Sequence, residues 1–134
     1  MKGSEIVNKA KSLLGTPYVF GAKYQDGVLT LNRLKSLKKE NPSTITENYY
    51  NKALKFVGKI CTDCSGLVCY CYNMKDIGSY SIYDKLKKIN LNKLKPGMAV
   101  WKPGHIGIYI GDGFVIEAKG INYGTIKSKL GDTP

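Results

Sequence analysis

The chain has 134 residues, of which 43% are hydrophobic and 23% charged, a balance that excludes a disordered protein. This length predicts one domain, residues 1–134, with a core that needs no metal or disulfide. A net charge of +11 predicts an anionic partner, although AT-rich coding would also produce an excess of lysine. Arg33 is the only arginine, and base recognition favours arginine. We therefore expect no specific nucleic-acid binding, whereas an anionic cell wall fits this charge.

Apolar runs are too short for a signal peptide or a membrane span. The longest run near the start, Leu13-Leu14, lies in a segment interrupted by lysines. We therefore expect a protein made in the cytoplasm, which would reach an extracellular target only after release.

The first half of the chain predicts helices. Ser4 can cap a helix that stops at Gly15, and Pro17 then favours an extended segment that carries Tyr18. Two more helices are expected within residues 22–60, the second after a capping box at 44–47. The apolar positions of these three helices are, in chain order, Ile6, Ala10, Leu13 and Leu14; Leu31, Leu34 and Leu37; and Tyr50, Ala53, Leu54 and Val57.

A central helix is expected from about Asp63 to Asn73, with Asp63 as its N-cap. Its inward-facing candidates are Leu67, Val68 and Cys71. A short amphipathic helix with Ile82, Leu86 and Ile89 is expected next.

From residue 98 the hydrophobic period changes to two, which indicates strands. Four consecutive antiparallel strands are expected at Met98–Trp101, His105–Ile110, Phe114–Ala118 and about Thr125–Ser128. Helices followed by a strand meander predict an α+β fold.

Cys64 and His105 are the candidate nucleophile and base. A thiol attacks carbonyls as the thiolate, and a helix N-terminus together with an imidazolium stabilises that anion. The amide near Cys64 could also donate to the oxyanion of a tetrahedral intermediate. A buried structural cysteine and an ordinary strand histidine remain the alternative interpretation.

The register of the second hairpin brings Glu117 to His105. With a three-residue loop at 111–113, Ile110 pairs with Phe114 and Gly107 lies opposite Glu117. Glu117 then shares a face with His105 and can orient its ring as the third member of a triad. A two-residue loop would turn Glu117 away, so this prediction depends on one register.

Four sequence blocks resemble the NlpC-type cysteine peptidase family. They are Gly15-Thr-Pro-Tyr-Val-Phe-Gly21, Thr62-Asp-Cys-Ser-Gly-Leu-Val68, Leu94-Lys-Pro-Gly-Met-Ala-Val-Trp101 and His105-Ile-Gly-Ile-Tyr-Ile-Gly-Asp-Gly113, in the order of the family. The resemblance implies a papain-like fold, in which the nucleophile helix packs on an antiparallel sheet. It also implies that Cys64 is the nucleophile and His105 the base.

The resemblance further implies a substrate. Members of the family generally cut peptidoglycan stem peptides, most often between D-glutamate and the following diamino acid. Tyr18 matches the family tyrosine near the nucleophile, and Asp63 and Ser65 match residues that line the stem-peptide pocket in some members.

Two departures accompany the resemblance. The third polar position is usually histidine, and here it is Glu117. Residues 22–60 are longer than typical and are expected to form a helical insertion that borders the cleft. We expect a monomeric catalytic module of the kind found in phage endolysins, in which a wall-binding domain commonly follows in the parent protein.

Other functions remain open from the sequence. Cys61 and Cys64 form a CxxC pair that could bind zinc, carry out dithiol chemistry or close into an inhibitory disulfide. Zinc binding usually needs a second pair of the same spacing, and a dithiol enzyme a surrounding βαβ pattern; the sequence has neither. We therefore expect no metal and no cofactor. A muramoyl-L-alanine amidase with the same Cys/His site, or a non-catalytic basic module that binds wall or nucleic acid, are the alternatives.

Overall fold

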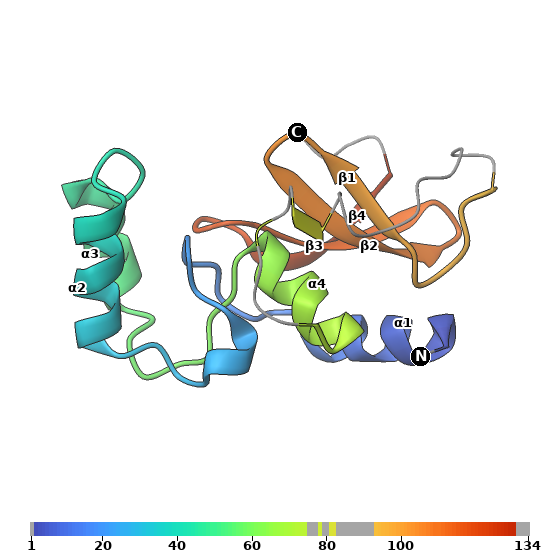
Figure 1. Cartoon of the computed structure of the whole chain (residues 1–134), viewed down its shortest axis with the longest axis horizontal. Coiled ribbons are helices and arrows are strands. Elements are labelled where there is room, and N and C mark those ends of the chain that lie inside the picture. Colours follow the sequence, from blue (N-terminus) through green and yellow to red (C-terminus); the bar gives the residue numbers. More distant parts are fainter. Residues whose placement is uncertain (1, 75–77, 79–80, 83–92, 131–134) are drawn as a thin grey trace.

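A computed structural model describes residues 2–74, 78, 81–82 and 93–130. In this part of the chain, helices precede strands, which confirms the predicted α+β class (Figure 1). None of the described helices is long and apolar enough to cross a membrane. The elements are α1 (Gly3–Ser12), the 3-10 helix η1 (Tyr24–Asp26), α2 (Leu31–Glu40), α3 (Glu47–Leu54), α4 (Cys64–Tyr72), β1 (Ala99–Lys102), β2 (His105–Gly111), β3 (Phe114–Gly120) and β4 (Gly124–Lys129).

The four strands form one antiparallel sheet in the order β1-β2-β3-β4. Helix α4 packs against β2 and β3, and α1 packs against α4. Every residue of α4 from Cys64 to Cys69 is buried, so the helix that carries Cys64 is the central one, as predicted.

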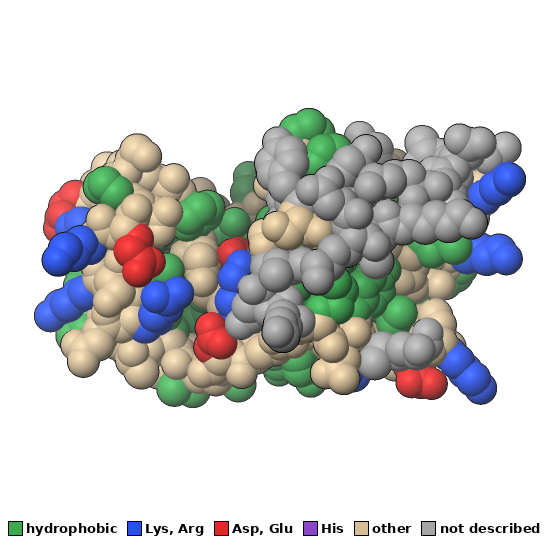
Figure 2. Space-filling view, viewed as in Figure 1, with side chains coloured by type: hydrophobic (Ala, Val, Ile, Leu, Met, Phe, Trp, Pro, Cys, Tyr) green, Lys and Arg blue, Asp and Glu red, His purple; other side chains and the backbone are tan. Residues whose placement is uncertain are grey.

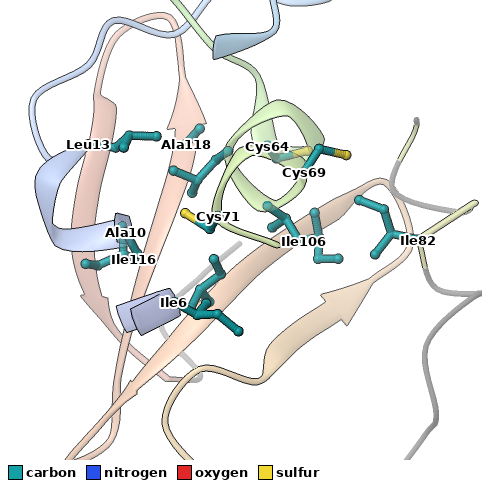
Figure 3. Close-up of a cluster of buried hydrophobic side chains, with 13 residues drawn as sticks. Ile6, Ala10, Leu13, Cys64, Cys69, Cys71, Ile82, Ile106, Ile116 and Ala118 are labelled. Carbon is teal, nitrogen blue, oxygen red and sulfur yellow. The ribbon is translucent and has the colours of Figure 1, made fainter. Parts of the chain in front are cut away.

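The first cluster of buried residues lies between α1, α4 and the sheet (Figure 3). Leu67 of α4 and Ile108 of β2 are fully buried in it. Burial of such side chains contributes about 1.5–3 kcal/mol each. The cluster consists of Ile6, Ala10, Leu13, Cys64, Leu67, Val68, Cys69, Cys71, Ile82, Ile106, Ile108, Ile116 and Ala118.

A second cluster lies beneath α2 and α3, which lie side by side at one end of the molecule (Figure 1). Residues 22–60 thus build a second small core together with Val19 and Cys61. The second cluster consists of Val19, Ala22, Leu29, Leu34, Leu37, Ile45, Ala53 and Cys61.

Several predicted helix ends differ by a few residues. Helix α1 begins at Gly3, with Ser4 inside it, and ends at Ser12 because the chain turns before Gly15. Leu14 therefore lies beyond the helix and is 45% exposed. Thr46, and not Thr44, caps α3 by accepting a hydrogen bond from the Tyr49 amide.

One further apolar position was predicted wrongly. Leu54, expected on the buried face of its helix, is 39% exposed. It is the last residue of α3, where less neighbouring structure covers it. The helix predicted around Ile82, Leu86 and Ile89 falls mostly outside the described residues, although Ile82 itself is described and buried.

The β2–β3 hairpin combines a tight turn with a bulge. Phe114 pairs with Gly111, and not with Ile110 as predicted, so the turn is one residue shorter. The register then shifts between Tyr109 and Gly111, and beyond this bulge Ile108 pairs with Ile116 as predicted. The extra residue in β2 compensates for the shorter turn, and Glu117 therefore faces His105.

Candidate active site

The start of α4 is fixed by its N-cap. The Asp63 carboxylate accepts a hydrogen bond from the Gly66 amide (2.8 Å), as predicted for an N-cap. The Asp63 amide in turn donates to the Ala22 carbonyl (2.7 Å). These bonds hold Cys64 at the first position of the helix, where the helix dipole and the free first-turn amides favour an anion.

His105 and Glu117 form the contact that the hairpin register predicted. Nε2 of His105 lies 2.8 Å from Oε1 of Glu117, whose side chain is fully buried. Gly107 makes this approach possible, because a Cβ there would lie 2.8 Å from Cγ1 of Val115 and 3.3 Å from Cβ of Glu117. With Nε2 bonded to Glu117, Nδ1 is the ring nitrogen that remains for Cys64.

The electrostatics favour a protonated His105. Burial lowers its pKa, but hydrogen bonds with Cys64 and with Glu117 outweigh burial and raise the pKa to about 9. Burial likewise raises the pKa of Glu117, and the contacts with His105, Ser128 and Lys119 more than reverse this and lower it. At neutral pH the site therefore consists of the Glu117 carboxylate, the His105 imidazolium and the Cys64 sulfur, in that order.

Tyr18 lies beside Cys64, as predicted. It pairs in a short parallel bridge with Thr62, two residues before Cys64. Burial and then electrostatic interaction with Cys64 and Asp63 raise the pKa of Tyr18. Its hydroxyl therefore keeps its proton and can donate a hydrogen bond near the sulfur.

Asp63 and Ser65, the other predicted binding residues, are engaged by a lysine. Nζ of Lys23 donates to both carboxylate oxygens of Asp63 (2.9 and 2.8 Å) and to the Ser65 hydroxyl (2.7 Å). The Lys23 and Asp63 side chains are 17% and 10% exposed. The polar side-chain atoms of Asp63 and Ser65, on either side of Cys64 in the sequence, are thus both bound to Lys23.

The remaining cysteines have structural positions. Cys61 belongs to the second cluster and Cys64 to the first, and the Cys61 thiol donates towards the Lys59 carbonyl (3.5 Å). Burial raises the pKa of Cys61 to about 11 and that of Cys71 to about 12, which keeps both thiols protonated at neutral pH. All four cysteines are thiols outside any disulfide, and among the described residues no His, Cys, Asp and Glu side chains gather as a metal site.

Comparison with protein families decides the classification. The model of the NlpC/P60 family matches residues 15–132. The chain belongs to the NlpC/P60 family. A comparison with curated protein sequences found no match.

Solved structures of NlpC/P60 proteins share the fold. The NlpC/p60 domain of the peptidoglycan hydrolase SagA is 24% identical, with a TM-score of 0.61 over 97% of this chain and 91% of that one. The peptidoglycan hydrolase RipB of Mycobacterium tuberculosis is 21% identical, with a TM-score of 0.64 over 95% and 57%.

A third similar structure comes from Trichomonas vaginalis. NlpC1 of Trichomonas vaginalis is 18% identical, with a TM-score of 0.61 over 98% of this chain. The chain spans 40% of the length of NlpC1 and 42% of the length of NlpC2 from the same organism. These likenesses confirm the papain-like NlpC/P60 fold.

Two residues of this NlpC/P60 site were missed by sequence reasoning. Lys23 follows the first motif block by two residues, and Tyr49 lies in α3. The Tyr49 hydroxyl accepts a hydrogen bond from the Phe20 amide (2.8 Å) and so holds the segment that carries Tyr18. No local sequence pattern predicts the contacts of Lys23 and Tyr49, because their partners lie 29 to 42 residues away along the chain.

Proposed function

We propose that this protein is a peptidoglycan hydrolase that uses Cys64 as its nucleophile, His105 as acid and base, and Glu117 to orient His105. The observation that carries the proposal is the buried Glu117 carboxylate 2.8 Å from the imidazole whose other partner is Cys64. Peptidoglycan hydrolases with this fold, SagA and RipB, support the substrate class. A net charge of +11 suits an anionic wall.

The reaction would begin as an acyl transfer. The Cys64 thiolate attacks the carbonyl carbon of the scissile amide, and the oxyanion that forms is stabilised by first-turn amides of α4. The carbon–nitrogen bond then breaks, and the His105 imidazolium gives its proton to the departing amine. The products of this half are a thioester on Cys64 and a free amino group.

Water completes the cycle. Neutral His105 takes a proton from the water that attacks the thioester, and the sulfur leaves as the thiolate, which restores the starting ion pair. Glu117 keeps the ring in one orientation through both halves and stabilises the imidazolium. Because its carboxylate is buried and hydrogen-bonded, it does so at little entropic cost.

We propose that the bond cut is the one between D-glutamate and the following diamino acid. This follows the resemblance of the motif blocks, and Tyr18, Asp63 and Ser65 would line the pocket for the stem peptide. Purified peptidoglycan digested with the protein and examined by mass spectrometry tests the proposal. A new free amino terminus on the diamino acid is the expected result.

The matched control is Cys64→Ser, which changes one atom at the start of α4. This variant should release no fragments while it still binds walls. A new N-terminal alanine in the wild-type digest would assign the protein as an amidase instead. Equal behaviour of both proteins, with binding and no cleavage, would make it a non-catalytic binding module.

A further inference from the structure

A hollow of about 420 Å³ lies between α2 and α3, in the region of the second cluster and apart from Cys64. One wall carries Lys35, Lys38 and Lys39 of α2. The opposite side carries Glu47 and the ring of Tyr50 from α3. The hollow therefore combines cations with an aromatic surface.

The charges in and around this hollow are unbalanced. Residues 31–59 contain seven basic and two acidic side chains, a net charge of +5. Both acidic groups are already paired, Glu40 with Arg33 and Glu47 with Lys38. Figure 2 shows basic side chains spread over the surface of this α2–α3 end, with acidic groups between them.

Two lysines of the hollow are left for a ligand. Lys35 and Lys39 are exposed, one helical turn apart, and no ion pair among the described residues includes either of them. Like charges at this spacing weaken a helix. Lys38 lies 4.6 Å from the centre of the Tyr50 ring and pairs with Glu47, so it holds the two walls together.

We propose that this hollow binds a phosphodiester polymer of the cell wall, built from polyol or sugar units. Lys35 and Lys39 would pair with successive phosphates, and the Tyr50 ring would contact the carbon skeleton between them. The partner rests on the proposed function, which places the enzyme at the wall. The hollow would hold the catalytic module to its substrate without using any group of the active site.

The chemistry of the hollow favours such a polymer over nucleic acid. Lysine binds phosphate as a point charge, whereas base reading relies on arginine forks, and Arg33 is paired with Glu40. Binding to single-stranded nucleic acid also relies on several stacking rings in a row, and the hollow offers the ring of Tyr50.

The test compares two double variants of the full chain. In Lys35→Gln/Lys39→Gln the hollow loses its unpaired cations; in Lys55→Gln/Lys59→Gln the same charge is lost beside Phe56, outside the hollow. Co-sedimentation is measured with purified walls that carry a phosphodiester polymer and with the same walls after removal of that polymer by acid. The first variant should bind polymer-bearing walls roughly tenfold more weakly than the control, with a shallower salt dependence.

Three results would overturn the proposal: equal binding by the two variants, equal binding of wild type to both kinds of wall, or stronger competition by single-stranded DNA than by the isolated polymer. Cleavage of a small soluble stem peptide is measured in parallel. The rate of cleavage should be the same in the wild type and in both double variants, since neither pair of lysines touches the active site. If none of the three proteins cleaves the peptide, the proposed function fails. The binding measurements still test whether the hollow binds the polymer.

Discussion

The two clusters of the molecule divide its properties between them. The first cluster, around α4 and the sheet, holds Cys64, His105 and Glu117 at fixed distances through strand register and a helix cap. The second cluster, under α2 and α3, is smaller and carries an excess of lysine on its surface. The difference teaches that the proposed chemistry and the proposed attachment to the wall rest on separate parts of one short chain.

The two regions meet in the segment from residue 16 to 23. The Phe20 amide donates to Tyr49 of α3, and Lys23 donates to the cap of α4. Gly21 lies against the second cluster, because a Cβ there would come within 2.6 Å of Cδ2 of Leu37. We therefore expect substitutions in this segment to affect both regions.

The largest effect is expected from Glu117→Gln, which removes the charge behind His105 and keeps its volume. The ratio kcat/KM should fall by roughly 100-fold, because the imidazolium loses its orienting partner. The pKa of His105 is about 9 in the protein. It should fall in the variant, because the contact with the Glu117 carboxylate no longer counteracts the lowering of this pKa by burial. The alkaline limb of the pH–rate profile should therefore move to lower pH, and an unmoved limb would contradict the role of Glu117.

The same pair predicts how stability depends on pH. Because the pKa of His105 rises from 6.5 to about 9 on folding, its contribution is full below about pH 6.5 and is lost as the pH rises through about 9. The pKa of Glu117 is lowered, so its contribution is lost as the pH falls. The gap in urea midpoint between wild type and Glu117→Gln should be widest near pH 5.5 to 6.5 and should shrink at pH 10.

The next effect separates the two clusters. Leu34→Ala, in the second cluster, should lower the free energy of unfolding by about 3 kcal/mol, since Leu34 is fully buried. Cleavage of a soluble peptide should change little below the melting temperature. Leu67→Ala is the matched control: it should cost a similar free energy but also reduce cleavage, because Leu67 lies in α4 with Cys64. Equal loss of activity in both variants would show that the two clusters act as one.

A smaller effect is expected from Lys23→Gln at the junction. Without the ammonium, the Asp63 carboxylate stands uncompensated next to Cys64 and disfavours the thiolate. We expect kcat/KM to fall roughly tenfold, with the acid limb of the pH–rate profile moved to higher pH. Lys59→Gln, in a loop away from α4, serves as the control. A loss of stability without any shift of the acid limb would reduce Lys23 to a structural role.

The smallest effect is expected from Tyr49→Phe. The Phe20 amide loses its acceptor, which should cost about 1 kcal/mol of stability in urea denaturation. Because this bond fixes the segment with Tyr18, KM for a stem peptide should rise a few-fold while kcat stays near that of wild type. Unchanged KM would mean that Tyr18 is held by other contacts.

Local patterns were enough to predict the site's main parts. Asp63 as a cap, the alternation of β2 and β3, and the small residue at Gly107 all act within a few residues or across one hairpin. The contacts of Lys23 and Tyr49 could not be predicted, since they form only when the two clusters pack. Leu54 was placed wrongly for a related reason, because helical periodicity marks a face but not how much of it is covered.

Other expectations concern the protein in its biological setting and stay predictions. They include synthesis in the cytoplasm with later release, a monomeric state, an origin in a phage endolysin and a wall-binding domain in the parent protein. The catalytic roles of Cys64, His105 and Glu117 have the geometry described above and await the kinetic tests.

The bulge in β2 makes the position of Glu117 depend on how one hairpin pairs. If the tight turn were kept and the extra residue of β2 paired with β3 in place of forming a bulge, every residue of β3 would slip by one position and Glu117 would turn away from His105. A homologue could then retain each of the three site residues and still lack the triad. Deletion of the extra residue, by contrast, would keep Ile108 paired with Ile116, so a single-residue gap in this hairpin matters only where the turn and the bulge do not change together.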